Sequence, residues 1–243
     1  MIAIVEKSVE RFRYRLLLGL AVALLLGQPL LQGTEAGMIA LDALFALTAA
    51  ATGLVTRSAS VARPLKVATP ALWLALHLLA RFTEASAIEA IAFLATLWLV
   101  FQTVWLTVEA LVRERKADGD ALAGAVFGYF MLALTWSQLY AAALLVDPGA
   151  LSAPGLAEGA RPLGSDLVYY SLVTLTTLGY GDVLPVTPLA RILAAAEAVL
   201  GALYIAVLIG RIASDLKPRG GRGRDASGPG DDGSAAGPEA PAD

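Results

Sequence analysis

The amino-acid sequence predicts an all-α membrane protein with six transmembrane helices and a re-entrant segment between the fifth and the sixth. Of its 243 residues, 57% are hydrophobic, and the mean hydropathy is +0.68. These values are high for a soluble domain and are typical of a helical membrane protein. The apolar residues also gather in long runs, and the basic residues lie in every second connection between those runs.

Six apolar runs are candidate transmembrane helices, and they cover residues 16–31, 38–55, 67–80, 85–112, 121–146 and 189–212. A helix needs about 20 residues to cross a bilayer, and the last three runs are easily long enough. The second run is adequate. The first is interrupted by Gln28 and Pro29, whereas the third is short and holds Pro70 and His77.

The positions of the basic residues support six spans, because Lys and Arg are enriched in cytoplasmic loops. They lie before the first run, after the second, after the fourth and after the sixth: Lys7, Arg11, Arg13, Arg15, Arg57, Arg63, Lys66, Arg113, Arg115, Lys116, Arg211, Lys217 and Arg219. The other connections hold only Arg81 and Arg161. We therefore expect an integral protein of a bacterial cell (inner) membrane with both termini in the cytoplasm.

The first run could instead be a signal peptide, with "RFRYR" as its basic region. No small-residue cleavage site follows it, and its removal would leave the other spans unchanged. At the other end, residues 218–243 are rich in Gly, Pro, Ala and charge and contain no aromatic or large aliphatic residue. Such a segment cannot bury enough apolar surface to fold, so we expect a disordered cytoplasmic tail and no appended small-molecule domain.

Several functional classes are excluded by residue counts. The sequence has no cysteine and one histidine, His77, so disulfides, thiolate chemistry and multi-histidine metal sites are excluded. An intramembrane hydrolase would need a nucleophile beside a base, and no Gly-x-Ser-x-Gly motif accompanies His77. We therefore expect a protein that is not an enzyme, holds no organic cofactor, binds no nucleic acid and contacts membrane lipid.

The segment "SLVTLTTLGYGDVLP", residues 171–185, interrupts this apolar pattern. A helix is predicted at 166–176, with Ser165 as its N-cap, and it is too short to span a bilayer. Gly179 and Gly181 then permit positive φ at alternate positions, which lets successive carbonyls point to one side. Irregular backbone at membrane depth is tolerated only inside protein or beside water. A column of carbonyls there can replace the hydration shell of a cation.

The residues "TTLGYGD", 176–182, resemble the signature of the potassium-channel superfamily, whose usual core is Thr-Val-Gly-Tyr-Gly. The resemblance covers roughly residues 121–214, with an outer helix, a turret, a pore helix, a filter and an inner helix in that order. It implies potassium-selective conduction by a homotetramer, in which each subunit supplies one side of the filter. The alternatives are a nonselective cation channel and a sensory or structural membrane protein without transport. The carbonyls of Thr177, Leu178, Gly179 and Tyr180, with the Thr177 hydroxyl, would coordinate potassium ions, and Gly181 would complete the outer end.

The same resemblance implies filter support by four residues: Tyr169, Tyr170, Thr174 and Asp182. Tyr169 would donate a hydrogen bond to Asp182, whereas Tyr170 and Thr174 would contact the Tyr180 hydroxyl across a subunit boundary. Ordinary packing of the pore helix is the alternative for the first three. Leu178 departs from the usual Val or Ile, although its carbonyl keeps the same role.

The inner helix would carry the cavity and the gate. Gly201 falls at the spacing of the family's gating hinge, but close helix packing explains a glycine there equally well. Ala202, Ile205 and Ile209 would line a cavity with Thr176 at its roof. Glu197 lies in the same helix, where it could bond hydroxyl groups of the pore helix or modulate ion occupancy.

The first four helices form a sensor-like domain without gating charges. The fourth run has no Lys or Arg before Arg113, whereas moving a charge through the field is worth about 2.3 kcal/mol per 100 mV. We therefore reject an arginine voltage sensor. Asp42, His77 and Glu89 instead predict an outer polar site or water-filled crevice, and His77 could sense pH there. Simple interfacial solvation of the three is the alternative.

The predicted organisation has four parts. These are a cytoplasmic N-terminal segment (1–15), a four-helix sensor-like domain (16–112), a pore domain (113–217) and the tail (218–243).

Overall fold

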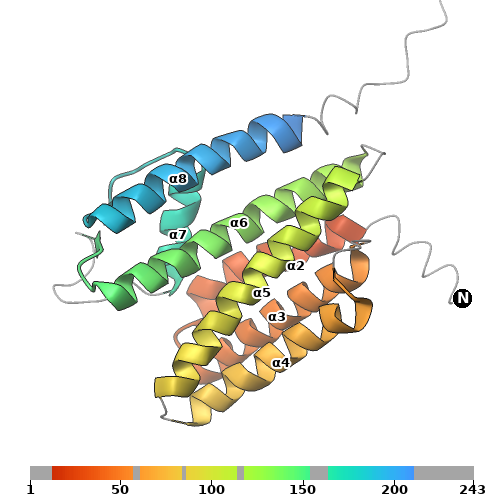
Figure 1. Ribbon diagram of the computed structural model, residues 1–243, viewed down its shortest axis with the longest axis horizontal. Coiled ribbons are helices and arrows are strands. Elements are labelled where there is room, and N and C mark those ends of the chain that lie inside the picture. The colour runs from red at the N-terminus through yellow and green to blue at the C-terminus, as the bar shows by residue number, and fades with distance from the viewer. Residues whose placement is uncertain (1–12, 57–60, 84–85, 114–117, 154–163, 211–243) are drawn as a thin grey trace, which may run out of the picture.

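The structure is a computed structural model that describes residues 13–56, 61–83, 86–113, 118–153 and 164–210 (Figure 1). Its helices are α2 (Arg13–Leu31), α3 (Glu35–Val55), α4 (Arg63–Phe82), α5 (Ser86–Arg113), α6 (Gly119–Val146), α7 (Gly164–Leu175) and α8 (Pro188–Tyr204), which continues as the π-helix η1 (Ile205–Ile209). Two-residue strands β1 (Leu151–Ser152) and β2 (Leu184–Pro185) pair antiparallel. Within this described part, six helices are long and apolar enough to cross a membrane, which confirms the predicted fold class.

Predicted and observed helix bounds agree within four residues. The largest difference is at α4, which covers Arg63–Phe82 although only 67–80 was predicted. Pro64 lies in the first turn of this helix, where the fixed φ of proline favours helix formation. Pro70 lies inside the helix. The N-terminal residues 1–12, the tail and the end of the predicted sixth helix lie outside the described residues, so their assignments stay predictions.

The helices are arranged with α8 at one edge and α3 and α4 at the opposite edge (Figure 1). Between them, α6 packs against α2, α5, α7 and α8. The short helix α7 packs against α6 and α8. Because α5 ends at Arg113 and α6 begins at Gly119, a short connection joins the first four helices to α6. Of these four, α2 and α5 make the main contacts with α6 of the same chain.

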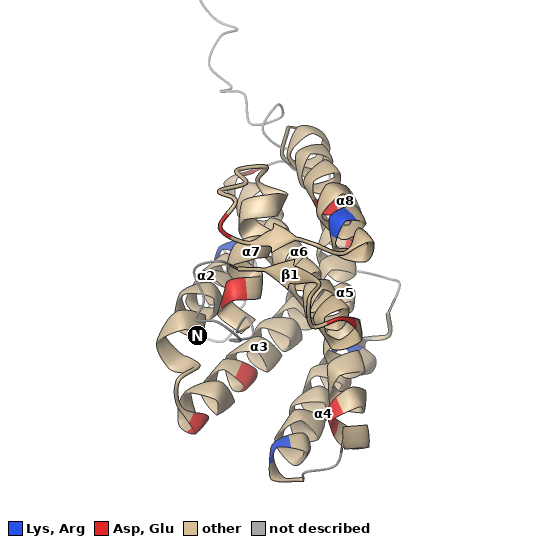
Figure 2. Cartoon of the chain, turned by 90° about the vertical axis from the view of Figure 1, so that its left-hand side faces the viewer, with Lys and Arg blue, Asp and Glu red and all other residues tan. Residues whose placement is uncertain are grey.

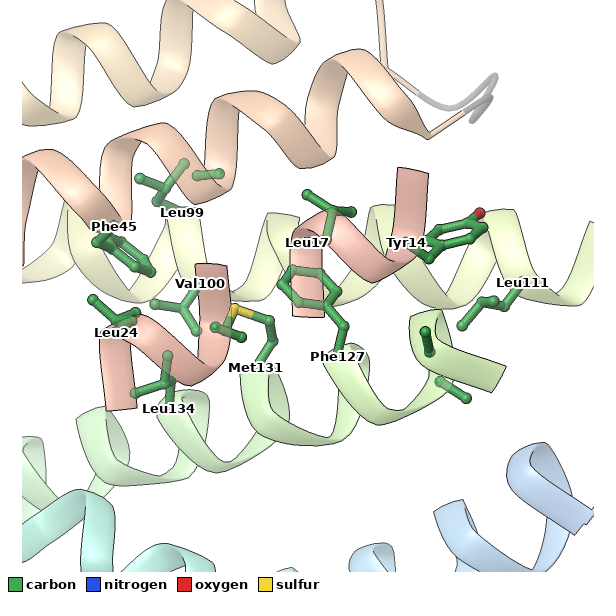
Figure 3. Close-up of a cluster of buried hydrophobic side chains, with 14 of the residues drawn as sticks. Tyr14, Leu17, Leu24, Phe45, Leu99, Val100, Leu111, Phe127, Met131 and Leu134 are labelled. Atoms are coloured by element: carbon green, nitrogen blue, oxygen red, sulfur yellow. The ribbon is translucent and has the colours of Figure 1, made fainter. Parts of the chain in front are cut away.

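One hydrophobic cluster joins the first four helices to α6 (Figure 3). Its large members are Tyr14, Leu17, Leu24, Phe45, Leu99, Val100, Leu111, Phe127, Met131 and Leu134. Phe127 and Met131 of α6 are completely buried among side chains of α2 and α5. Between membrane helices this contact is stabilised mainly by close packing, because lipid is as apolar as the protein interior. The two predicted domains therefore share one core.

Polar contacts also hold α2 to α6 and α7 near its two ends. At the start of α2, the Asp120 carboxylate accepts hydrogen bonds from the backbone N–H groups of Tyr14 (3.3 Å) and Arg15 (3.1 Å). Just after the end of α2, the Gln32 amide donates to the Ser165 hydroxyl at 2.6 Å and accepts from the Ser165 N–H at 3.4 Å. Both contacts satisfy backbone N–H groups that a helix start leaves without a partner.

The predicted N-cap role of Ser165 is wrong. Helix α7 begins one residue earlier, at Gly164, so Ser165 is its second residue. Its hydroxyl accepts a hydrogen bond from Gln32, a residue 133 positions away in the sequence. Because that partner comes from a distant helix, local capping rules could not identify it.

Charged residues are sparse on this bundle (Figure 2). Two acidic residues, Asp42 in α3 and Glu197 in α8, nevertheless lie well inside membrane-spanning helices. Ionisable groups at such positions are costly and are usually functional. Each of the two belongs to a polar network, and both networks are described below.

Candidate functional site

The segment after α7 has an alternating backbone conformation. Thr177 has φ +59°, Gly179 has φ +57° and Gly181 has φ +80°. Within the described part of the chain, no other residue has positive φ. Left-handed residues at every second position turn successive peptide planes the same way, so that their carbonyls can face one side. The two glycines adopt this conformation without a steric penalty.

Thr177 adopts the same conformation against its preference. A left-handed backbone costs an ordinary residue roughly 1–2 kcal/mol, and a β-branched residue there is a genuine outlier. The start of the segment is held by backbone hydrogen bonds, from Thr177 N–H to Thr174 O at 2.9 Å and from Leu178 N–H to Val173 O at 2.9 Å. Strained backbone of this kind concentrates at functional sites. The sequence predicted positive φ at Gly179 and Gly181 but not at Thr177.

This segment has little cover from its own chain. All residues from 176 to 182 are exposed, and Leu178 and Tyr180 keep 56% and 67% of their surface open. Irregular backbone of this kind cannot face lipid. In the membrane, it must therefore be covered by other protein or must border water.

The outer end of the segment is tied to α7. The Tyr169 hydroxyl donates a hydrogen bond to Asp182 Oδ2 at 2.6 Å. This bond lowers the pKa of Asp182, because it stabilises the charged carboxylate. Tyr170 lies on the other side of α7, where it is buried and packs edge-on against Tyr140, with ring centroids 4.7 Å apart. The predicted contact of Tyr170 and Thr174 with Tyr180 crosses a subunit boundary, so it stays a prediction.

A buried acid holds the middle of α7. Glu197 of α8 has no exposed surface, and the Tyr140 hydroxyl of α6 donates to its Oε2 at 2.6 Å. The Ser171 hydroxyl of α7 lies 2.5 Å from Glu197 Oε1 and 2.8 Å from the Ala133 carbonyl oxygen of α6. The sequence left two uses for Glu197 open, and the structure places it against the Ser171 hydroxyl of α7.

The network can be completed with the two hydroxyl protons that it contains. Tyr140 donates to Glu197 Oε2, and Ser171 can donate to Oε1 or to the Ala133 carbonyl oxygen. Fully satisfied buried networks rigidify a core, whereas partly satisfied ones are costly.

The C-terminal end of α7 rests on Gly201. A Cβ atom at Gly201 would overlap the carbonyl oxygen of Leu175, the last residue of α7. The Tyr129 hydroxyl donates to that same oxygen at 2.9 Å. Of the two uses considered for Gly201, the structure contains the close packing, because only a hydrogen atom fits at this contact.

Helix α8 changes from an α-helix to a π-helix beyond Gly201. Residues Ile205–Ile209 form a π-helix, a feature that is rare and often lies at functional sites. Ala202 and Ile205 are exposed, as expected for a cavity face. Ile209 is half-buried and packs against the core cluster, because the wider π turn changes the register of the side chains that follow it. Thr176 is exposed, and its hydroxyl donates to the Leu172 carbonyl at 2.7 Å.

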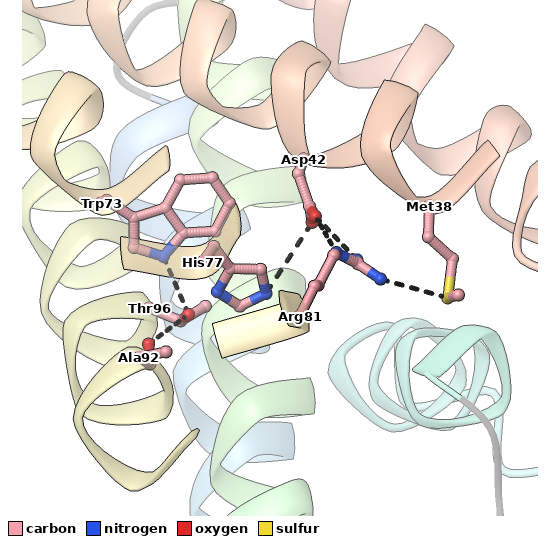
Figure 4. A network of polar contacts seen from close by, with 7 residues as sticks. All are labelled: Met38, Asp42, Trp73, His77, Arg81, Ala92 and Thr96. Carbon is pink, nitrogen blue, oxygen red and sulfur yellow. Dashed lines mark hydrogen bonds and ion pairs between the residues drawn. The ribbon is translucent and has the colours of Figure 1, made fainter. Parts of the chain in front are cut away.

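The outer polar residues do come together (Figure 4). Arg81 donates to Asp42 Oδ2 from Nη2 at 2.7 Å and from Nε at 3.0 Å. His77 Nε2 lies 3.8 Å from Asp42 Oδ1, and the His77 ring stacks on Trp73 with centroids 4.7 Å apart. Glu89 borders the same pocket. Three helices thus contribute to one site.

Sequence reasoning missed Tyr129 and Tyr140 as partners of α7. A usable signal existed, because the two tyrosines are eleven residues apart and about three helical turns place them on the same face. Tyr204 belongs to the same group: its hydroxyl donates to the Ala125 carbonyl at 2.8 Å, and its ring lies 5.6 Å from that of Tyr129.

Comparison with known proteins gives two matches. Residues 150–217 match the family model described as "Ion channel". A protein of Rhodopseudomonas palustris named "Putative potassium channel protein" is 41% identical over 49 residues, which cover 20% of this chain and 12% of that protein. The chain thus matches only about an eighth of the length of this relative. No solved structure matches the chain.

The buried acid gives the first prediction. We expect Glu197→Ala to lower the thermal stability of the purified protein, because it removes the partner of two buried hydroxyls at about 1–3 kcal/mol each. Glu197→Gln should stay close to wild type, since its amide can donate to Ser171 while its oxygen accepts from Tyr140. Melting temperatures in detergent measure this, with the exposed Glu35→Ala as control. Equal losses for both variants would contradict the network.

The Tyr169–Asp182 bond gives the second prediction. In Tyr169→Phe we expect the pKa of Asp182 to rise toward its ordinary value of about 3.9. Because the bond depresses the folded pKa, its stabilisation is present above the unfolded pKa and is lost as pH falls through the folded pKa. Carbon-13 titration of the labelled Asp182 carboxyl measures the shift. Tyr129→Phe, which leaves this bond intact, is the control, and an unchanged pKa in Tyr169→Phe would refute the assignment.

Proposed function

We propose that this chain, an ion channel integral to the membrane, is one subunit of a potassium-selective homotetramer. Residues 177–181 would form the filter, and conduction through it would be passive. The observation that carries the proposal is the left-handed backbone at Thr177, Gly179 and Gly181. The resemblance of "TTLGYGD" to the potassium-channel signature and the name of the Rhodopseudomonas relative support the choice of ion.

The chemistry of selection would come from backbone oxygens. A dehydrated cation needs several oxygen ligands at once, and rings of carbonyls supply them. The carbonyls of Thr177, Leu178, Gly179 and Tyr180 would form successive rings, with the Thr177 hydroxyl at the inner site and Gly181 at the outer end. The side chain of Leu178 is exposed in the single chain and would pack behind the filter or against a neighbouring subunit.

Assembly around the filter follows from the same geometry. One strand supplies one side of an ion site, so several copies must surround an axis. The exposure of residues 176–182 in the single chain supports such an arrangement, because only neighbouring protein or water can cover them. Four copies would also bring Tyr170 and Thr174 close to a neighbour's Tyr180. The basic connections favour cytoplasmic termini in a bacterial inner membrane.

Gating would involve the inner helix. Gly201 is fixed against Leu175, so bending there would separate α8 from the pore helix. The π-helix Ile205–Ile209 follows immediately, and helix kinks are common at such π-bulges. We infer that Ile205–Ile209 is the flexible point, with Thr176, Ala202 and Ile205 lining the cavity. Within the described residues, α5 carries no basic residue before Arg113, so voltage acting on arginines of that helix would not drive the movement.

The test is ion flux from liposomes that contain the purified protein. We expect potassium flux to exceed sodium flux clearly, and Gly179→Ala to abolish it, because alanine is strained at φ +57°. Gly19→Ala is the matched control, since a Cβ atom at Gly19 would meet no atom within 4 Å. Equal potassium and sodium flux would replace the proposal with a nonselective cation channel.

A further inference from the structure

A pocket lies among α2, α3, α4, α5 and α6, away from the proposed filter. Its volume is about 490 Å³, within the roughly 300–1,000 Å³ typical of small-molecule sites. No residue of α7 or α8 lines it. The pocket is therefore separate from the conduction path, although it shares α6 with the pore domain.

Aromatic rings form one wall of the pocket. Phe45, Trp73 and Phe93 line it together with His77. The ring of Phe45 meets that of Trp73 edge-on at 5.0 Å, and Trp73 stacks on His77 (Figure 4). The Trp73 N–H is already used, because it donates to Thr96 Oγ1 at 2.9 Å. Trp73 can therefore offer an occupant its ring rather than its donor group.

The charge of the pocket is unbalanced. Asp42 and Arg81 form an ion pair, so their charges offset each other. Glu89 is a second carboxylate on the wall, and it is exposed and has no hydrogen bond or ion pair in the described part of the chain. With His77 neutral, the charged groups of the wall sum to one negative charge. A singly charged cation would complement it.

The unpaired hydrogen-bonding atoms of the pocket also agree with a cation. Gln28 Oε1 and His77 Nδ1 are buried without a partner, and both residues line the pocket. An amide oxygen can only accept, so the group that satisfies Gln28 must donate. The donors of Arg81 are directed to Asp42 and to the sulfur of Met38. The Gln28 oxygen can therefore be satisfied only by an N–H or O–H donor, which agrees with an occupant that carries N–H groups.

We propose that this pocket binds a small organic cation that joins a protonated amine or guanidinium to an apolar ring. The cationic end would contact the Glu89 carboxylate, and the apolar ring would pack against the aromatic wall formed by Phe45, Trp73 and Phe93. Leu134 of α6 is part of the wall, and the adjacent Ala133 carbonyl holds Ser171 of α7. An occupant therefore contacts the helix that supports the pore helix.

The experiment uses the full chain in nanodiscs and isothermal titration with 2-phenylethylamine, with empty nanodiscs as the blank. 2-Phenylethanol is the neutral probe of the same shape. We expect saturable binding of the amine at least tenfold tighter than that of the alcohol. Glu89→Gln should weaken amine binding tenfold or more. The matched control Glu35→Gln changes an exposed acid outside the pocket and should bind as wild type does.

Three results would overturn the proposal. They are an absence of saturable amine binding, equal affinity for the two probes, or unchanged affinity in Glu89→Gln. Because Glu89 is exposed and without a partner in the described residues, its substitution should leave the fold intact, and a size-exclusion profile verifies this. The measurement is binding rather than flux, so it is independent of whether the channel selects potassium.

Discussion

Irregular backbone at membrane depth needs partners for its polar groups, and the rest of this structure is arranged around that requirement. Residues 176–182 leave α7 with alternating left-handed backbone and little cover from their own chain. Such a segment keeps one conformation only if the helix before it is fixed. Helix α7 is held at its start by Gln32, in its middle by Glu197 through Ser171, and at its end by Tyr129.

Helix α6 carries most of these contacts to the remainder of the chain. Its Tyr129, Ala133 and Tyr140 contact α7 or the acid behind it, while Phe127 and Met131 are buried in the core shared with α2 and α5. Because packed helices move as rigid elements between discrete arrangements, a change among the first four helices would reach α7 through α6. The short connection between α5 and α6 keeps this contact within one chain.

Much of this fold could be predicted from hydrophobic patterning, because apolar runs, basic connections and paired glycines are local signals. The six spans and the short helix before "TTLGYGD" follow from them. The missed features are pairings between distant residues. Ser165 was predicted to be an N-cap, but its hydroxyl instead accepts a hydrogen bond from Gln32. The left-handed Thr177 contradicts its own local preference, and the π-helix that turns Ile209 into the core has no signature in residue spacing. The conformation at such residues is determined by tertiary contacts, which cannot be read from a single sequence.

We propose that residues 177–181 of several copies form one carbonyl-lined ion path. Anomalous diffraction from crystals of the full chain grown with thallium, which replaces potassium and scatters strongly, tests it most directly. We expect four chains around one axis and a row of thallium peaks beside the carbonyls of Thr177, Leu178, Gly179 and Tyr180. Peaks confined to side-chain carboxylates, or an assembly in which these segments do not face a common axis, would contradict it.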